Sequence, residues 1–166
     1  MKIPRKIFHM TMIILGFVAA IFLGIMAGRL FGTKVVVDGN SMEPTVASND
    51  TVRVNKLIYK LRKPGRLDMV VFDMGKSETS RYFVRRVVGL PGETVQIIEG
   101  KIYINDEPLE YKYNNEYIED AGLASEPVTL GIEEYFVIGD NYNQCDDSRF
   151  GSIGNLDKDQ IVGKAG

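Results

Sequence analysis

Residues 82–104 read YFVRRVVGLPGETVQIIEGKIYI, and this stretch indicates the secondary structure of most of the chain. Three runs rich in β-branched and aromatic residues, at 82–88, 94–98 and 101–104, are separated by short segments that contain Gly or Pro. This pattern is typical of antiparallel strands joined by tight turns. Only Glu99 and Gly100 separate the last two runs, and Gly readily adopts the positive φ that a two-residue turn requires. We therefore expect a β-hairpin over 94–104.

Similar runs lie on both sides of this stretch. They are KVVVD at 34–38, TVRVN at 51–55, MVVFD at 69–73 and YFVI at 135–138. Many short strands with few helix signals predict a mostly β domain, either barrel-like with antiparallel sheets or a sandwich. The polar and aperiodic stretch 111–126 is predicted to be a surface excursion.

Composition excludes several classes of protein. The 166 residues carry 20 Lys and Arg against 22 Asp and Glu, a net charge of −2, without the basic excess that nucleic-acid binders show. One cysteine excludes an intramolecular disulfide framework, and one histidine with one cysteine excludes a His/Cys metal cage. No EF-hand spacing is present. We expect no cofactor, no metal and no nucleic-acid partner.

The N-terminal segment departs from the β pattern. Ile7 to Gly28 are 22 consecutive residues without a formal charge, and a helix of that length spans about 33 Å, enough to cross a bilayer core of roughly 30 Å. A cleavable signal peptide has a shorter apolar region, so we expect a permanent anchor; a buried core helix is the alternative. Because basic residues are concentrated in 1–6, we expect a cytoplasmic N-terminus (1–6), a single membrane span (7–28) and an extracytoplasmic β domain (29–166).

Three polar clusters lie between the predicted strands. In DGNSMEPT, at 38–45, a serine in a Gly-containing turn can present its hydroxyl beside backbone N–H groups. Arg85 and Arg86 lie in the middle of the apolar strand 82–88, and strand alternation sends them to opposite faces. The third cluster is GDNYNQCDDSRFG at 139–151. Taken singly, the clusters are also consistent with an ordinary loop, two ion pairs and a hydrogen-bonded turn network.

Taken together, the clusters resemble those of a known family. An apolar segment followed by SMEPT (41–45), RVVGLPG (86–92) and GDN…DSR (139–149) resembles the type I signal peptidases, and the short chain resembles the Gram-positive type. The resemblance implies a membrane-anchored, signal-peptidase-type β domain on the outer face of the cell membrane, with a small second lobe at roughly 94–130. It also implies a serine endopeptidase with a Ser/Lys dyad, which cleaves signal peptides after small residues such as Ala.

The resemblance assigns roles to individual residues. Ser41 stands at the position of the nucleophile, and its main-chain N–H is implied to form the oxyanion hole. Gly39 stands where some relatives carry a second serine hydroxyl, and Met42 is expected to line the substrate cleft. Asp147 and Arg149 match the Asp and Arg of the DSR string, which brace the catalytic region of the family.

The general base is where this sequence departs from the family. The family lysine directly precedes the Arg of the RVxGLPG string, and here that position is Arg85. Neutralising an arginine at pH 7 costs roughly 7.5–9 kcal/mol, against about 4.6 kcal/mol for lysine, so a guanidinium cannot accept the serine proton. The family serine that orients the lysine is replaced by Cys145, and Tyr142 replaces a family arginine. The histidine base of eukaryotic-type relatives has no counterpart, because the one histidine is His9 in the apolar segment.

Two functions follow from these substitutions. The preferred hypothesis is a signal-peptidase-like pseudoenzyme, inactive or very weakly active, which binds a signal peptide or pilin-like segment of exported proteins. The resemblance extends to non-cutting relatives that assist pilus assembly. The alternative is an active serine endopeptidase that removes signal peptides from secreted pre-proteins with Ser41. A cell-surface β domain without a cleft is a third possibility. The membrane bilayer is a partner in either of the first two cases.

Overall fold

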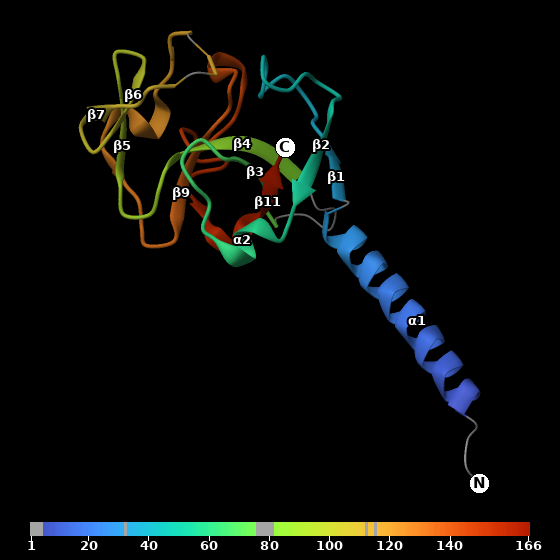
Figure 1. The fold of residues 1–166 in the computed structure, drawn as a ribbon. Helices are drawn as coiled ribbons and strands as arrows, with labels where there is room; N and C mark the ends of the chain where they lie inside the picture. The colour runs from blue at the N-terminus through green and yellow to red at the C-terminus, as the bar shows by residue number, and fades with distance from the viewer. Residues whose placement is uncertain (1–4, 32, 76–81, 112, 115) are drawn as a thin grey trace.

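The computed structural model describes residues 5–31, 33–75, 82–111, 113–114 and 116–166. A long helix, α1 (Arg5–Phe31), projects from a β domain that holds the other described elements (Figure 1). Within α1, the window His9–Met26 is long and apolar enough to cross a membrane, and none of it is buried against the rest of the chain. This exposure contradicts the alternative of a buried core helix, because a core helix has to cover its apolar side chains.

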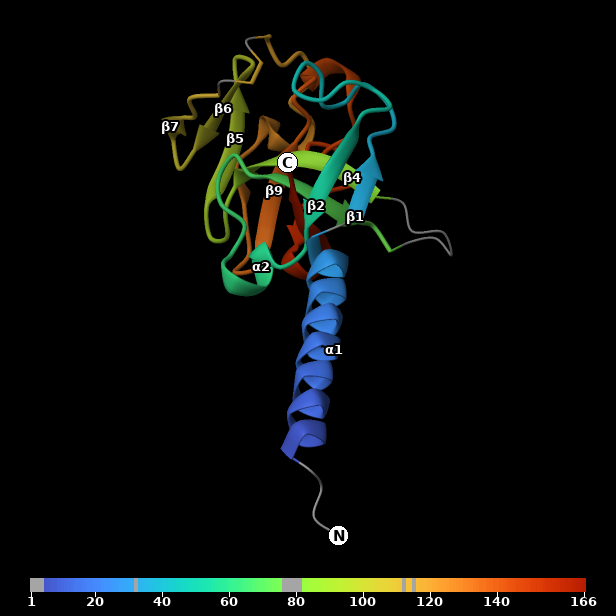
Figure 2. The ribbon, with the colours of Figure 1, turned by 45° about the vertical axis from the view of Figure 1, so that its right-hand side comes forward.

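The larger sheet is antiparallel and curls across the β domain (Figures 1 and 2). Its described strands lie in the order β1, β2, β11, β3, β4, β9, β10. They are β1 (Thr33–Val36), β2 (Thr51–Asn55), β3 (Met69–Asp73), β4 (Tyr82–Gly89), β9 (Glu134–Ile138), β10 (Leu156–Asp157) and β11 (Ile161–Ala165). The predicted strands at 51–55 and 69–73 are confirmed to the residue. The sequence did not predict β11, which pairs with β2 and β3 and thereby places the C-terminal strand inside the sheet.

A smaller sheet has the strand order β7, β6, β5, β8. Its strands are β5 (Thr94–Ile98), β6 (Lys101–Ile104), β7 (Glu107–Pro108) and β8 (Val128–Thr129). The predicted hairpin is confirmed: β5 pairs antiparallel with β6 across a turn in which Glu99 and Gly100 have φ of 47° and 67°. Both positive values fit a two-residue turn that follows the twist of the strands.

Short helices complete the domain. They are α2 (Ile58–Leu61) and the 3₁₀ helices η1 (Gly122–Ser125), η2 (Tyr142–Gln144) and η3 (Lys158–Gln160). The stretch 111–126 contains η1 and no strand within its described residues. The fold is therefore mostly β, with curled antiparallel sheets and one long N-terminal helix, as predicted.

Strand β4 positions the site, because it lies between β3 and β9 in the larger sheet. Seven of its eight residues are at least partly covered, and six are buried. One hydrophobic core lies between the two sheets, around Val88, Ile102 and Phe136. Another lies beneath the residues that follow β1, around Met42, Val54 and Val84. The chain segments on both sides of the site thus rest on packed side chains, which fixes their positions.

Candidate active site

Ser41 lies in a turn that follows β1 and is fastened to the core. The main-chain N–H of Asn141 donates to the carbonyl oxygen of Ser41 over 3.0 Å, and the N–H of Val46 donates to the carbonyl of Met42 over 2.9 Å. The Met42 side chain is completely buried among valines of β1 to β4. The expectation that Met42 lines the cleft is therefore wrong: the thioether packs into the core and holds the turn from below.

The two arginines of β4 occupy opposite faces, as strand alternation predicts. Arg86 pairs with the fully buried Asp140 through Nε–Oδ1 at 2.8 Å and Nη2–Oδ2 at 2.5 Å. Asp140 also accepts hydrogen bonds from the hydroxyls of Thr45 and Tyr111. Burial alone would lower the pKa of Arg86, but the hydrogen bond to Asp140 and the charge of that carboxylate, with smaller effects from Tyr111 and Tyr113, together outweigh burial and raise the pKa. Arg86 is thus a fixed structural cation with a carboxylate of its own.

Arg85 reaches Ser41 on the other face of the strand. Its Nη1 donates to Oγ of Ser41 over 2.8 Å and to the carbonyl oxygen of Val84 over 2.6 Å, and its Nε donates to the carbonyl oxygen of Asp146 over 2.7 Å. The side chain is buried, with 6% of its residue surface exposed. All three acceptors are uncharged, so none of these hydrogen bonds neutralises the guanidinium of Arg85, whereas Arg86 is bonded to a carboxylate.

No carboxylate in the described part of the chain forms an ion pair with Arg85. Burial lowers the pKa of Arg85 because the charged form loses solvation, although the Cys145 thiol and the nearby carboxylates of Asp147 and Asp146 act in the opposite direction. An ordinary arginine pKa is about 12.5 or higher, so the group remains a cation at physiological pH.

Asp147 is engaged by Arg149. The Nε and Nη2 atoms of Arg149 donate to Oδ1 and Oδ2 of Asp147 at 2.9 Å, and both side chains are fully buried. The main-chain N–H groups of Gly139 and Arg149 donate to the same carboxylate. Arg149 also donates through Nη1 to the carbonyl oxygen of Asp120 over 2.8 Å. The pair therefore braces the loop 139–149 against the end of the 111–126 excursion.

The thiol of Cys145 lies beside this pair. Its Sγ donates to Oδ2 of Asp147 over 3.1 Å. Burial and the Asp147 carboxylate raise the pKa of the Cys145 thiol to about 12, so the thiol stays protonated at neutral pH. Because only the thiolate is an effective nucleophile or base, the Cys145 thiol cannot serve as the base for Ser41.

A cleft of about 290 Å³ opens beside Ser41. Its walls are the segments 37–41 and 82–85, with 144–146 closing a third side. Gly39 lines the cleft and has a φ of 84°, which a larger residue adopts only with strain. Gly139 packs closely against Ser41 and Cys145. A Cβ added at residue 139 would lie 2.4 Å from Sγ of Cys145 and 2.6 Å from the carbonyl oxygen of Ser41.

This geometry can bind a polar group, but the described side chain that is hydrogen-bonded to Ser41 is not a proton acceptor. The Ser41 hydroxyl accepts a hydrogen bond from Arg85, so its own proton is available to donate into the cleft. General-base catalysis requires a neighbour that can take that proton. Neither the Arg85 cation that donates to Ser41 nor the protonated Cys145 thiol can do so. The carboxylates of Asp38 and Asp146 also line the cleft, but among the described residues neither is hydrogen-bonded to Ser41.

Part of the site was not predicted from the sequence. The Arg86–Asp140 pair joins Thr45 and Tyr111, which lie 95 and 29 residues from Asp140 in the chain. Asp140 belongs to the GDN string, so a signal for the aspartate was present, but its partners depend on the tertiary fold. Tyr142 is 4% exposed and packs in the core with Tyr111 instead of facing the cleft.

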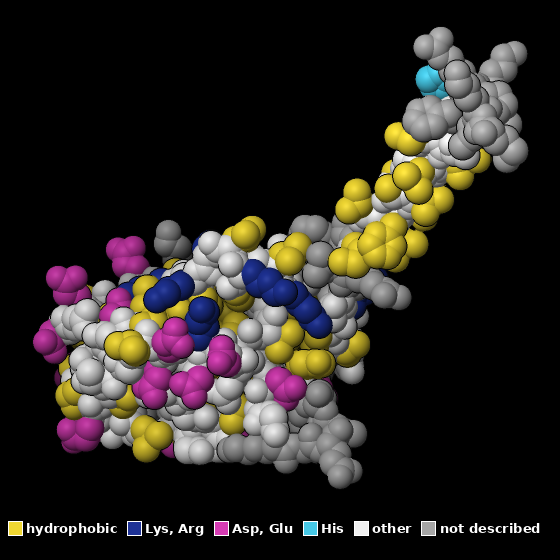
Figure 3. Space-filling model, turned by 90° about the horizontal axis from the view of Figure 1, so that it is seen from below, with side chains coloured by type: hydrophobic (Ala, Val, Ile, Leu, Met, Phe, Trp, Pro, Cys, Tyr) yellow, Lys and Arg dark blue, Asp and Glu magenta, His cyan; other side chains and the backbone are white. Residues whose placement is uncertain are grey.

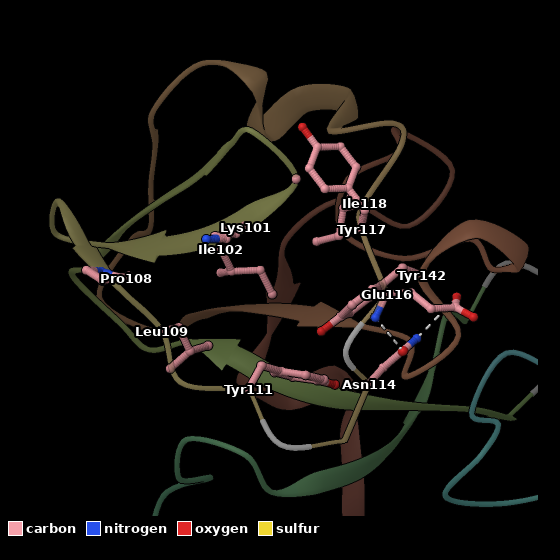
Figure 4. Close-up of a pocket in the computed structure, with 11 residues that line it drawn as sticks. Lys101, Ile102, Pro108, Leu109, Tyr111, Asn114, Glu116, Tyr117, Ile118 and Tyr142 are labelled. Carbon is pink, nitrogen blue, oxygen red and sulfur yellow. Dashed lines mark hydrogen bonds between the residues drawn. The ribbon is translucent and has the colours of Figure 1, made fainter.

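A second cavity, of about 280 Å³, lies on the side of the smaller sheet (Figure 4). Leu109, Tyr111 and Ile118 face it, and Asn114 and Glu116 hydrogen-bond to each other at its edge. Asn114 also donates to the carbonyl oxygen of Asp140 over 2.8 Å. One residue of this cavity is therefore hydrogen-bonded to the aspartate that pairs with Arg86.

Comparison with known proteins identifies the family. The family described as signal peptidase, peptidase S26, matches residues 8–166. Signal peptidase I P of Bacillus subtilis subsp. natto is 32% identical over 153 residues, which cover 88% of this chain and 81% of the relative. Signal peptidase I U of Bacillus subtilis is 31% identical over 169 residues, which cover 98% of this chain and 88% of the relative.

A crystal structure agrees with these relatives. A signal peptidase I from Enterococcus faecalis superimposes with a TM-score of 0.50 at 29% identity and covers 62% of this chain and 97% of that one. The family match, the relatives and the shared fold agree with the strings at Ser41, Arg86 and 139–149. The chain belongs to the signal peptidase family, peptidase S26.

Proposed function

We propose that this protein binds the signal segments of exported polypeptides and does not cleave them at a significant rate. The observation that carries the proposal is the hydrogen bond of 2.8 Å from Nη1 of Arg85 to Oγ of Ser41. A cation that donates to the hydroxyl occupies the place from which a base would have to remove its proton. Loss of a general base costs about 10²–10⁴ in rate.

The cleft remains suited to an extended peptide. One long wall is the segment 37–41, which follows strand β1, and the other is 82–85 of strand β4. The described pairing of β4 with β9 begins at Arg86, so 82–85 extend beyond that pairing. A peptide in extended conformation can add main-chain hydrogen bonds to such walls, which gives affinity without a dependence on one sequence. Export signals are the ligand class that the family suggests, and they include signal peptides and pilin-like segments.

We also propose that the protein is a single-pass membrane protein with a cytoplasmic N-terminus. In this arrangement residues 1–6 are cytoplasmic, 7–28 cross the bilayer and 29–166 form the extracytoplasmic domain. Two features support the proposal: the exposed apolar surface of α1, and the basic residues that precede it. Seen from below, the hydrophobic surface of α1 runs into a face of the β domain where Lys and Arg side chains lie among hydrophobic ones (Figure 3). Protease added to intact protoplasts should degrade the β domain; protection until lysis would contradict the orientation.

An active Ser41 peptidase is the second candidate. It is favoured by the match to proteins named signal peptidase I over most of the chain and by the placement of Ser41 in a cleft. The two candidates differ in one measurable property, which is Ser41-dependent hydrolysis.

The deciding experiment uses the full-length protein in mild detergent with a signal-type peptide that carries Ala at the −1 and −3 positions. Binding is followed by fluorescence anisotropy, and cleavage is followed by mass spectrometry on the same samples. We expect saturable binding and no cleavage above that of the Ser41→Ala variant. Hydrolysis by the unaltered protein that disappears in Ser41→Ala would establish the peptidase instead.

A further inference from the structure

Among the described residues of the β domain, three arginines are buried, and they differ in how their charge is neutralised. Arg86, Arg149 and Arg85 are 3%, 1% and 6% exposed. Arg86 is paired with Asp140, and Arg149 is paired with Asp147. Arg85 donates only to neutral oxygens, and no carboxylate of the described residues forms an ion pair with it. A buried charge without an ion-pair partner is costly. The carboxylates of Asp147 and Asp146 raise the pKa of Arg85 without forming an ion pair with it, so an anion bonded directly to Arg85 would stabilise the charge further.

The guanidinium of Arg85 also has donors to spare. Its described hydrogen bonds use Nε and Nη1, and none involves Nη2. Among the described residues, the side-chain polar atom that is buried and has no hydrogen-bond partner is Oη of Tyr135. Nη2 of Arg85 has no described partner and does not belong to this class, so it is accessible to solvent. Because Arg85 lines the cleft, its unused N–H groups and the free hydroxyl proton of Ser41 form a set of donors there. Two neighbouring donors, on Arg85 and Ser41, are the complement of one carboxylate, although Asp38 and Asp146 also line the cleft.

We infer that this cleft captures the free α-carboxylate at the C-terminus of a polypeptide, in preference to an uninterrupted peptide bond. The inference rests on the proposed function, and it names the ligand of the same site. A carboxylate can accept from Nη2 of Arg85 and from Oγ of Ser41 and can neutralise the buried cation. A C-terminal amide would place its own NH₂ donor among these donors, which loses hydrogen bonds.

The position of the site selects a main-chain carboxylate. Ser41 stands where the family nucleophile meets a backbone carbonyl carbon, so a peptide laid in the cleft brings backbone atoms to this point. A chain that ends there presents its terminal carboxylate directly to Arg85 and Ser41. The class of ligand is therefore a polypeptide that ends in a small residue, as a signal segment does after another enzyme has cut it.

The test compares three peptides on the full-length protein in detergent. They share a signal-type sequence ending in Ala-Xaa-Ala and carry a free carboxylate, a C-terminal amide, or an amide with Glu as the last residue. We expect the acid to bind about tenfold or more tightly than the amide, as one charged hydrogen-bonded contact provides. The Glu amide should bind like the plain amide. Equal affinity for acid and amide would overturn the inference, and tight binding of the Glu amide would show that any carboxylate suffices.

Variants locate the effect. Arg85→Gln should abolish the preference for the acid, Arg85→Lys should retain part of it, and the exposed Arg53→Gln should leave it unchanged. The acid–amide ratio of the unaltered protein tests the inference even if Arg85→Gln does not fold. A longer peptide that spans the cleavage position separates this inference from the proposed function. If the longer peptide binds without being cut while the acid and the amide bind equally, the carboxylate inference is wrong and the proposed function stands. If no peptide binds, the inference and the proposed function are both wrong.

Discussion

Arg149 donates two hydrogen bonds of 2.9 Å to Asp147, one to each carboxylate oxygen. Asp147 is thus the ion-pair partner of Arg149 and not of Arg85. This pairing affects the charge in the Ser41 cleft. Arg85 contacts Ser41 as a cation without an ion-pair partner among the described residues, at the position where the resemblance predicts a lysine. The Asp147 carboxylate therefore stabilises the loop 139–149 through Arg149 and does not form an ion pair with the arginine that contacts Ser41.

Restoring the lysine should restore hydrolysis. A buried lysine without a carboxylate partner has a lowered pKa, because burial disfavours the ammonium form. We expect Arg85→Lys to raise Ser41-dependent cleavage of the signal-type peptide by about 10²–10⁴-fold. The combination with Cys145→Ser should be more active, since a hydroxyl can orient the amine. Mass spectrometry of the products checks this, with Ser41→Ala added to each variant as the control. If neither lysine variant cleaves, Arg85 is not the main obstacle.

Removing the charge of Asp147 should unfold the loop that carries Cys145. In Asp147→Asn, Arg149 remains buried without its carboxylate, and a broken buried pair costs about 3–5 kcal/mol. Thermal unfolding of the full-length protein in detergent, followed by near-ultraviolet circular dichroism, measures the loss. Asp146→Asn is the matched control, because Asp146 is an exposed neighbour. Equal stability of the two variants would refute the structural role given to the Asp147–Arg149 pair.

A methyl group at residue 139 should disturb Ser41 from behind. In Gly139→Ala the new Cβ meets Sγ of Cys145 and the carbonyl oxygen of Ser41 at 2.4 and 2.6 Å. Such overpacking costs about 1–3 kcal/mol and should weaken peptide binding. At the exposed Gly151, an added Cβ meets nothing within 4 Å, so Gly151→Ala should change stability by less than about 0.5 kcal/mol. Wild-type affinity in Gly139→Ala would show that the turn does not depend on this contact.

Asp68 should contribute to stability above pH 4 and lose that contribution in acid. Burial alone would raise the pKa of Asp68, but hydrogen bonds from Arg62, Lys164 and the N–H of Gly65 outweigh it and lower the pKa to about 2. The ordinary value is about 3.9. A carboxyl whose pKa is lower in the folded state stabilises fully above the unfolded value and loses this effect as the pH falls toward the folded value.

The measurement is thermal unfolding of the unaltered protein and Asp68→Asn between pH 7 and pH 2. We expect the unaltered protein to be the more stable of the two at pH 7, and the difference to shrink as the pH falls from about 4 to about 2. A difference that stays constant over this range would show that Asp68 is not stabilised as a carboxylate.

Local patterns in the sequence determined the strands and the helix. Runs such as TVRVN and MVVFD are short, β-branched and bounded by turn residues, so local preference and burial agree. The two residues between β5 and β6 specify their turn for the same local reason. The length and apolar composition of α1 are also properties of one segment. The strings around Ser41 and Arg86 allowed the family to be predicted; the substituted base at Arg85 stays a prediction.

Tertiary structure alone decided which charges pair and which side chains face the cleft. Strand alternation predicts that Arg85 and Arg86 lie on opposite faces, but it does not predict their partners. In the folded chain Arg86 pairs with Asp140, whereas Arg85 forms no ion pair with a described carboxylate. Met42 follows Ser41 directly, yet the valines of four strands bury it in the core. Strand β11 acquires its place only through pairing with β2 and β3, which are distant in the chain. These relationships join residues that are far apart in the sequence, and the energy that fixes them comes from burial and charge pairing in the assembled core, which no single segment contains.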